Sequence, residues 1–225
     1  MAMTFANQQT LLSVLLGDSN TGTDDAFPLA TRKLFLNRGE LQFCKDSKCV
    51  REKATGTISG TQLAFPSDLL HPVSLIINGK DVWNDRQTSI TEYERWNTSG
   101  SAYPAVYITQ ESGTRYFNFW GSANGQSYIL HYIKKPTTAL SSDSDESIHL
   151  DEFREAPVYW CAGELLQQAG KNAIADKYKA IYNKFVRDGE KYAEDMYLNL
   201  YYPKPDTNFI DTGETDVAGY GMDVA

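Results

Sequence analysis

The chain has 225 residues, of which 41% are hydrophobic and 12% aromatic, so it can bury a core, and this argues against disorder throughout. Its formal net charge of -8 argues against a protein that follows nucleic-acid phosphates with a basic surface. No stretch approaches the ~20 apolar residues of a membrane span, and the amino terminus lacks the basic start and cleavage site of a signal peptide. We therefore predict a soluble protein, made inside the cell, with no membrane partner.

The chain begins with two predicted helices. Apolar residues recur at helical spacing over residues 4 to 16, and the pattern stops at Gly17, which suits a helix end. After a turn-rich segment, Pro28 falls in the first turn of a second helix, whose apolar positions are three and four residues apart. This stripe leaves Arg32, Lys33, Arg38 and Glu40 largely outside, so we expect these side chains to be solvated.

The middle third of the chain has the pattern of a small antiparallel β module. From about residue 54 the helical period gives way to alternation, and Pro66 ends the first run. Two apolar runs flank Asn78 and Gly79, a pair that readily takes the positive backbone angles of a tight hairpin turn. Residues 104 to 136 supply three further strand candidates, separated by Ser-Gly and Asn-Gly turns.

Helical period returns in the last third. The first of two helices is apolar over most of its circumference, which is typical of a helix in the middle of a bundle. Pro157 either starts the regular part of this helix or kinks it, because proline has no N–H to donate. After Gly170, a last helix has apolar residues four, three, four and seven apart from Ile174 to Tyr192.

These patterns predict an α+β protein that is one structural unit overall. Helices from residues 1–53 and 138–199 form a bundle, and residues 54–137 form a β-rich insertion between them. Residues 200–225 contain two prolines, three glycines and five acidic residues against Lys204. We therefore expect an extended acidic tail at the C-terminal end.

An acidic, serine-rich turn precedes the most apolar helix. Asp143 and Asp145 begin like a calcium loop, but the later glycine and the distal glutamate of such a loop are missing. Ser144, Ser147 or Asp151 can instead accept hydrogen bonds from the unpaired amides at a helix start, where carboxylates also suit the helix dipole. We interpret the turn as a helix cap, with Ser147 and Asp151 as the capping residues.

Other residue types used in catalysis are scattered along the chain. His71, His131 and His149 fall in three different predicted elements, so we interpret them as structural residues. The three cysteines have no zinc spacing and are expected to be reduced thiols. The sequence has no nucleophile elbow, phosphate loop or C-x-x-C pair. We predict that the protein is not an enzyme and has no cofactor; the alternative is a hydrolase that uses the acidic turn, Glu146 included, with a histidine.

The aromatic content is the other unusual feature, with 14 Tyr, 10 Phe and 4 Trp. One predicted strand carries aromatic residues on both faces: Tyr116, Phe117, Phe119 and Trp120. Either one of these faces contacts another protein or a carbohydrate, or both faces belong to a β core.

Three motifs and their order carry a family resemblance. They are the turn G-x-x-x-x-x-P-x-D from Gly60 to Asp68, the strand end from Tyr132 to Pro136, and the acidic loop before an Ala/Leu-rich helix. With two helices in front and an amphipathic helix behind, this arrangement resembles the head-to-tail adaptor proteins of tailed bacteriophages, which are also called connector or head-completion proteins. The resemblance covers about residues 5 to 195.

The resemblance implies a non-enzymatic structural protein of the virion. Such a protein forms a homo-oligomeric ring, expected to be a dodecamer, which docks on the portal protein and connects it to tail or nozzle proteins. DNA would pass through the lumen without specific binding, and the ring would assemble in the host cytoplasm. The alternative function is an aromatic-faced β module that binds a carbohydrate or a receptor, as in a tail-tip or cell-surface protein.

Two groups of residues are the expected contact sites. A tail that becomes ordered on a neighbour gives up conformational entropy but covers a large surface. We expect residues 200–225 to reach onto the portal or an adjacent subunit, with five anchors: Tyr201, Tyr202, Phe209, Ile210 and Tyr220. In the β module, contacts with the tail or a neighbouring subunit are expected from Tyr116, Phe119 and Trp120.

Overall fold

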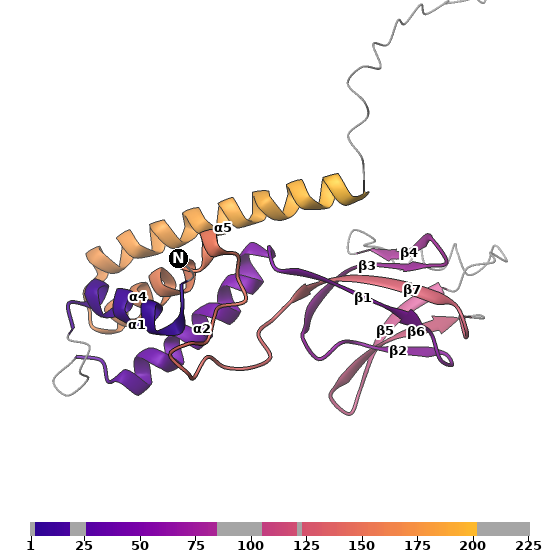
Figure 1. Cartoon of the computed structure of the whole chain (residues 1–225), viewed down its shortest axis with the longest axis horizontal. Coiled ribbons are helices and arrows are strands. Elements are labelled where there is room, and N and C mark those ends of the chain that lie inside the picture. The colour runs from indigo at the N-terminus through magenta and orange to yellow at the C-terminus, as the bar shows by residue number, and fades with distance from the viewer. Residues whose placement is uncertain (1–2, 19–25, 85–104, 121–122, 202–225) are drawn as a thin grey trace, which may run out of the picture. The chain divides into compact units, whose positions relative to one another are not determined.

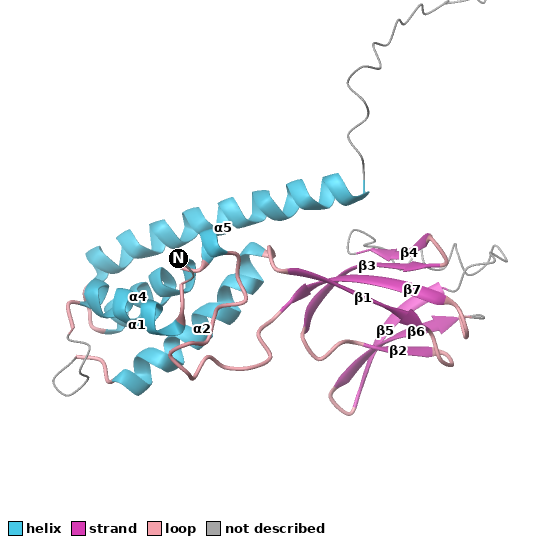
Figure 2. Ribbon diagram, in the orientation of Figure 1, coloured by secondary structure: helices cyan, strands magenta, loops and turns pink. Residues whose placement is uncertain are grey.

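The computed structural model describes residues 3–18, 26–84, 105–120 and 123–201 (Figure 1). In these residues the predicted α+β class is confirmed, with helices in the first and last parts of the sequence and strands between them (Figure 2). The chain divides into Met1–Ala193 and the shorter unit Glu194–Ala225. The expected tail beyond residue 201 lies outside the described residues.

The described helices are α1 (Phe5–Leu16), α2 (Leu29–Ser47), the 3-10 helix η1 (Asp151–Phe153), α4 (Ala156–Gln168) and α5 (Asn172–Tyr201). Thr4 caps α1 by accepting a hydrogen bond from the Asn7 N–H, and Gly17, with a φ of 72°, ends it as predicted. Pro28 precedes α2 as its N-cap residue, one position before the predicted first turn. Its fixed φ and missing N–H make it equally suitable there.

The helical core forms where α1, α2 and α4 pack together. As predicted, α4 is buried over most of its circumference, and Pro157 starts this helix without kinking it. The buried cluster between the helices includes Phe5, Leu12, Leu16, Phe35, Leu36, Val158, Cys161, Ala162, Leu165 and Leu166. A second cluster joins the end of α2 to α5 and includes Phe43, Phe153, Ala156, Tyr182 and Ala193.

Gly39 sets the spacing between α2 and α4. A Cβ atom at this position would lie 2.7 Å from the Pro157 carbonyl oxygen and 3.2 Å from the Pro157 Cα, and neither backbone atom can move without shifting the helix. The two helices can therefore pack this closely only because residue 39 has no side chain.

We expect Gly39→Ala to lower the free energy of unfolding by about 2 kcal/mol, because overpacking against backbone outweighs the better helix propensity of alanine. Gly163→Ala is the matched control, since its new Cβ would meet mainly the flexible Lys179 side chain. Urea unfolding of both variants tests the prediction. Equal stability of the two variants would contradict it.

Two antiparallel sheets form the β module. The first has the order β1-β7-β3-β4 and the second β2-β6-β5. The strands are β1 (Arg51–Thr57), β2 (Gln62–Ala64), β3 (Leu69–Ile77), β4 (Lys80–Asn84), β5 (Ala105–Glu111), β6 (Thr114–Trp120) and β7 (Ser127–Lys134). Both sheets contribute to one buried cluster, which includes Leu75, Ile77, Phe117, Phe119 and Leu130.

The hairpin between β3 and β4 forms at the predicted turn. Asn78 and Gly79 have φ angles of 48° and 78°, the positive values that a tight two-residue turn requires. The Ser112-Gly113 turn between β5 and β6 repeats this geometry with φ angles of 47° and 84°. Among the described residues, no helix combines the length and the apolar character needed to cross a membrane.

Candidate functional site

The acidic turn caps α1 with its main chain. The carbonyl oxygen of Asp145 accepts a hydrogen bond from the Phe5 N–H at 2.8 Å, and that of Asp143 accepts one from the Ala6 N–H at 3.2 Å. The Asp145 carboxylate folds back and accepts hydrogen bonds from the N–H groups of Ser141 and Ser142, which lower its pKa. The turn thus satisfies amides at the start of the first helix of the chain.

This finding corrects the prediction that Ser147 and Asp151 cap the apolar helix. The N-cap residue of α4 is Glu155, and no side chain bonds to its first turn. Ser147 donates a hydrogen bond to Glu40 at 2.6 Å, while Asp151 forms an ion pair with Arg154 at 3.1 Å. The two residues lie too far upstream, because the helix begins only at Ala156.

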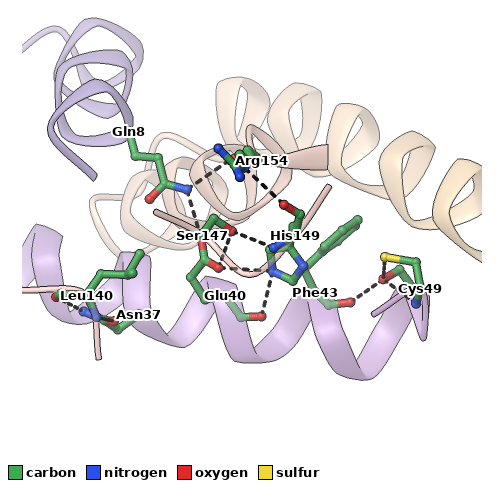
Figure 3. A network of polar contacts seen from close by, with 10 residues as sticks. Gln8, Asn37, Glu40, Phe43, Cys49, Leu140, Ser147, His149 and Arg154 are labelled. Carbon is green, nitrogen blue, oxygen red and sulfur yellow. Dashed lines mark hydrogen bonds and ion pairs between the residues drawn. The ribbon is translucent and has the colours of Figure 1, made fainter. Parts of the chain in front are cut away.

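A buried polar cluster joins α1, α2 and the segment after the acidic turn (Figure 3). We call its four residues, Gln8, Glu40, Ser147 and His149, the latch. The Glu40 carboxylate accepts hydrogen bonds from Gln8 Nε2 at 2.9 Å and from Ser147 Oγ at 2.6 Å. His149 Nε2 lies 3.2 Å from Glu40 Oε2 and 3.2 Å from the Glu40 carbonyl oxygen. The latch thus holds three chain segments that are far apart in the sequence.

The latch contradicts the expectation that Glu40 and Arg32 are solvated. Glu40 is only 2% exposed and Arg32 only 1%. Glu40 faces the segment of residues 147–149, and Arg32 donates a hydrogen bond to Ser13 Oγ at 2.6 Å. Each polar group is buried because a segment distant in the sequence supplies hydrogen-bond partners for it.

The electrostatics of the latch favour a charged pair. Burial alone raises the pKa of Glu40, but the contacts with His149, Ser147 and Gln8 together lower it below its ordinary value. Burial lowers the pKa of His149, yet its contacts with Cys49 and Glu40 outweigh this effect and raise the pKa to about 9. At neutral pH, the carboxylate and the imidazolium therefore form an ion pair inside the helical core.

Arg154 extends the latch to the surface. Its carbonyl oxygen accepts a second hydrogen bond from Gln8 Nε2 at 3.0 Å, and its Nε donates to the His149 carbonyl oxygen at 3.1 Å. The guanidinium also forms an ion pair with Glu146 at 3.0 Å. These bonds fix the chain between the acidic turn and α4 onto the helical core.

The geometry of the latch is structural, although it contains a serine, a histidine and a carboxylate. Ser147 Oγ donates to Glu40, whereas a nucleophilic serine would donate to the histidine. The side chains of Ser147, His149 and Glu40 are buried. In the described ranges, no group of three or more histidine, cysteine, aspartate and glutamate residues could hold a metal ion.

The structure places the other histidines and the cysteines in separate elements. His71 lies in β3 and His131 in the neighbouring strand β7, whereas His149 follows the acidic turn in the helical part. Cys44, Cys49 and Cys161 are free and buried. Burial, followed by the charge of Glu40, raises the pKa of Cys44, which makes this thiol unreactive.

The motif residues of the β module lie together. Asp68 accepts a hydrogen bond from the Tyr132 hydroxyl at 3.1 Å, and its carbonyl oxygen accepts one from the Lys135 N–H at 2.8 Å. Burial and then the bond to Asp68 raise the pKa of Tyr132. Gly60 has a φ of 77° and donates its N–H to Asn124 Oδ1 at 2.8 Å. The motif thus fixes the turns of the β module.

Of the expected contact residues in the β module, Phe119 is only 5% exposed and belongs to the core with Phe117. This position removes Phe119 from the candidate contacts and favours the β-core interpretation of these aromatic residues. Tyr116 is half-buried, and the Trp120 side chain lies outside the described residues. Of the five expected tail anchors, Tyr201 ends α5 and the other four lie outside the described residues.

Comparison with known families adds the decisive observation. The profile of a family described as SU10 adaptor protein matches residues 3–203. This range includes the described helices and strands together with the latch. No curated protein matches the chain. Because the matched range is most of the chain, the resemblance found in the sequence is confirmed: the chain belongs to the SU10 adaptor protein family and is a structural adaptor of a bacteriophage.

Proposed function

We propose that this adaptor assembles as a homo-oligomeric ring, expected to be a dodecamer, that docks on the portal protein and connects it to tail or nozzle proteins. The family match over residues 3–203 is the observation that carries the proposal. DNA passes through the lumen without specific binding, which the net charge of -8 supports because acidic surfaces repel phosphates. The ring assembles in the host cytoplasm before it becomes part of the virion.

The internal ties of the helical part support this role. A ring closes only if each subunit presents its two contact surfaces at a constant angle. The ion pair between Glu40 and His149 and the close approach at Gly39 restrict movement of the helices within one subunit. A subunit built in this way keeps its interface geometry during assembly.

The tail is the proposed second means of contact. Residues 202–225 follow the last residue of α5, and 24 extended residues can span about 80 Å. We propose that this segment reaches the portal or an adjacent subunit, with Tyr201, Tyr202, Phe209, Ile210 and Tyr220 as anchors. Aromatic side chains suit such contacts, because they bury a large area with few rotatable bonds.

Native mass spectrometry of the full chain, alone and mixed with the portal protein encoded in the same genome, tests the ring. We expect a stoichiometric complex in which adaptor subunits form a ring on the portal. A chain that stays monomeric and does not bind the portal would refute the proposal.

Removal of residues 203–225 tests the tail in the same assay. We expect this shortened chain to lose most of its binding to the portal, because the proposed anchors from Phe209 onward are absent. Thermal unfolding of the two chains provides the control, since the deletion leaves the described residues in place. Undiminished ring assembly by the shortened chain would contradict the proposed role of the tail.

A further inference from the structure

One side of α2 combines positive charge with exposed leucine. Five residues spaced four, three, four and three apart form a line along the helix and at its C-cap: Leu34, Arg38, Leu41, Lys45 and Lys48. Arg38, Lys45 and Lys48 are exposed, and so is 51% of the Leu34 surface. We call these five residues the α2 face; none of them is acidic.

The charge of the α2 face is not neutralised by the part of the chain that the structure describes. Within the described ranges, Arg38, Lys45 and Lys48 form no ion pair. Asp46 borders the face, but its carboxylate accepts a hydrogen bond from the Tyr182 hydroxyl of α5 at 2.6 Å. A face of this kind suits a partner surface that has carboxylates together with apolar side chains.

The segment of residues 141–155 has the matching composition. Besides the buried and paired His149, it has six acidic residues against one basic residue, Arg154, which gives a net charge of -5. Ile148 and Leu150 are 36% and 40% exposed. Five of the acidic side chains are exposed as well: Asp143, Glu146, Asp151, Glu152 and Glu155. The segment thus supplies both kinds of group that suit the α2 face.

Hydrogen bonds fix the beginning of this segment to one side of α2 (Figure 3). Ser147 and His149 contact the buried Glu40 carboxylate at 2.6 and 3.2 Å. Just before the segment, Leu140 accepts a hydrogen bond from the Asn37 side chain at 3.0 Å and donates one to it at 2.6 Å. The segment is therefore an ordered surface and does not move freely over the helix.

The α2 face lies on a different side of the helix from these bonds. Arg38 precedes Glu40 by two residues and Lys45 follows it by five, so both lie about 140° to 160° away from Glu40 around the helix axis. The bonds at Glu40 hold residues 147–149 against the other side of α2. If the acidic segment covers an α2 face, that face belongs to another copy.

A second copy is the partner that the charges favour. A cyclic ring joins each subunit to its neighbours through two different surfaces, and every subunit must carry both of them. The α2 face and the segment of residues 141–155 have opposite charges, and each exposes apolar side chains. Complementary charges of this kind select a partner and fix how the two surfaces meet.

We propose that the segment of residues 141–155 from one copy docks on the α2 face of a second copy. This inference rests on the proposed ring and names the two surfaces through which neighbouring subunits meet. The contact joins carboxylates to Arg38, Lys45 and Lys48, and it covers Leu34 with Ile148 and Leu150. Because much of the attraction is electrostatic, the contact weakens as salt concentration rises.

Two charge-reversed chains test the contact by native mass spectrometry, with and without the portal protein. In the first variant, Arg38→Glu and Lys45→Glu change the charge of the α2 face from +3 to -1. In the second variant, the charge of the segment changes from -5 to +1 through three substitutions: Asp143→Lys, Glu152→Lys and Glu155→Lys. All five positions are exposed. Each variant alone should form roughly tenfold fewer complexes than the unmodified chain, because like charges then meet.

An equimolar mixture of the two variants should assemble again. The negative α2 face of the first variant meets the positive segment of the second, while the unchanged segment of the first meets the unchanged face of the second. With the second variant ¹⁵N-labelled, native mass spectrometry should find the two variants in equal numbers in each complex. Such recovery requires contact between two copies, because neither chain contains both reversed surfaces.

Two controls separate this effect from net charge and from folding. Lys177→Glu combined with Lys184→Glu changes the net charge as much as the first variant does, at exposed positions of α5, and should leave assembly unchanged. Arg38→Gln combined with Lys45→Gln removes charge without reversing it and should cause a smaller loss than the first variant. Thermal unfolding of every chain verifies that the fold is retained.

Three outcomes would overturn the inference. They are normal assembly of either charge-reversed variant alone, a mixture that does not recover, and an equal loss in the α5 control. If the unmodified chain forms a ring on the portal and one of these outcomes occurs, only the inference fails. If the variants behave as expected but no chain binds the portal, the proposed docking on the portal fails instead. A chain that stays monomeric under all conditions overturns both.

Discussion

Replacing Glu40 by glutamine should lower the free energy of unfolding by on the order of 3 kcal/mol at neutral pH. The substitution leaves the buried His149 imidazolium without its partner carboxylate, and an uncompensated buried charge is strongly destabilising. Urea unfolding followed by circular dichroism measures the loss. Glu52→Gln is the control, because the Glu52 carboxylate makes exposed contacts, an ion pair with Lys134 and a hydrogen bond from the Lys53 N–H. This substitution should cost less than about 1 kcal/mol.

A double-mutant cycle separates the ion pair from the other bonds of Glu40. Combining Glu40→Gln with His149→Gln removes both charges, so the double variant should be more stable than the sum of the two single losses predicts. A coupling of about 2 kcal/mol is expected for residues in direct contact. If the two losses simply add, the pair does not act as an ion pair.

The stability of the protein should also fall as pH rises from about 6.5 to about 9. His149 has a pKa of about 9 in the folded chain, above its ordinary value of 6.5, so the folded state holds this proton more tightly than the unfolded state. The contribution of His149 is therefore fully present below pH 6.5 and is lost as pH passes through 9. The difference corresponds to at most about 3 kcal/mol.

Glu40 and His131 affect the pH dependence of stability only below this interval. Glu40 has a lowered pKa, so its contribution is present above its ordinary value of 4.5 and is lost as pH falls. The pKa of His131 is lowered by burial and by Lys53 and Arg51, so its effect on stability appears only below pH 6.5. From pH 6.5 to about 8, the decline in stability should come from His149, whereas the buried Cys44 and Cys161 thiols, whose pKa values are raised by burial, add to it as pH approaches 9.

Urea unfolding at closely spaced pH values measures the profile. The double variant with glutamine at positions 40 and 149 has neither charge, so its stability should stay nearly constant from pH 6.5 to about 8. Observation of the His149 ring by NMR provides a direct check on the folded chain. A midpoint near 6.5, or the same slope in the double variant, would contradict the prediction.

The local elements of the fold could be predicted because each depends on neighbouring residues. The Asn78-Gly79 turn forms where the sequence predicted it, since few other residue pairs tolerate two positive φ angles. Gly17 ends α1 for a similar reason, because glycine readily takes the positive φ angle that this helix end requires. The apolar circumference of α4 identified a buried helix, because a period of 3.6 residues can be recognised within a short window.

The latch could not be predicted, because its partners come from distant parts of the sequence. Glu40 and Arg32 lie on the polar side of the helical stripe. Only the folded chain brings Ser147 and His149 next to Glu40, and Ser13 next to Arg32. The error over the acidic turn has the same origin. Proximity in the sequence pointed to α4, whereas Asp143 and Asp145 meet the amides of α1.

By itself, the sequence determined the α+β class, the turns and the order of parts that marks the adaptor family, because periodicity and backbone preferences act over a few residues. The tertiary structure alone decided which polar side chains face inward and which helix the acidic turn caps. A buried charge is tolerated only where several segments converge to supply hydrogen bonds and an opposite charge. That convergence is a property of the folded chain, and no single stretch of the sequence contains it.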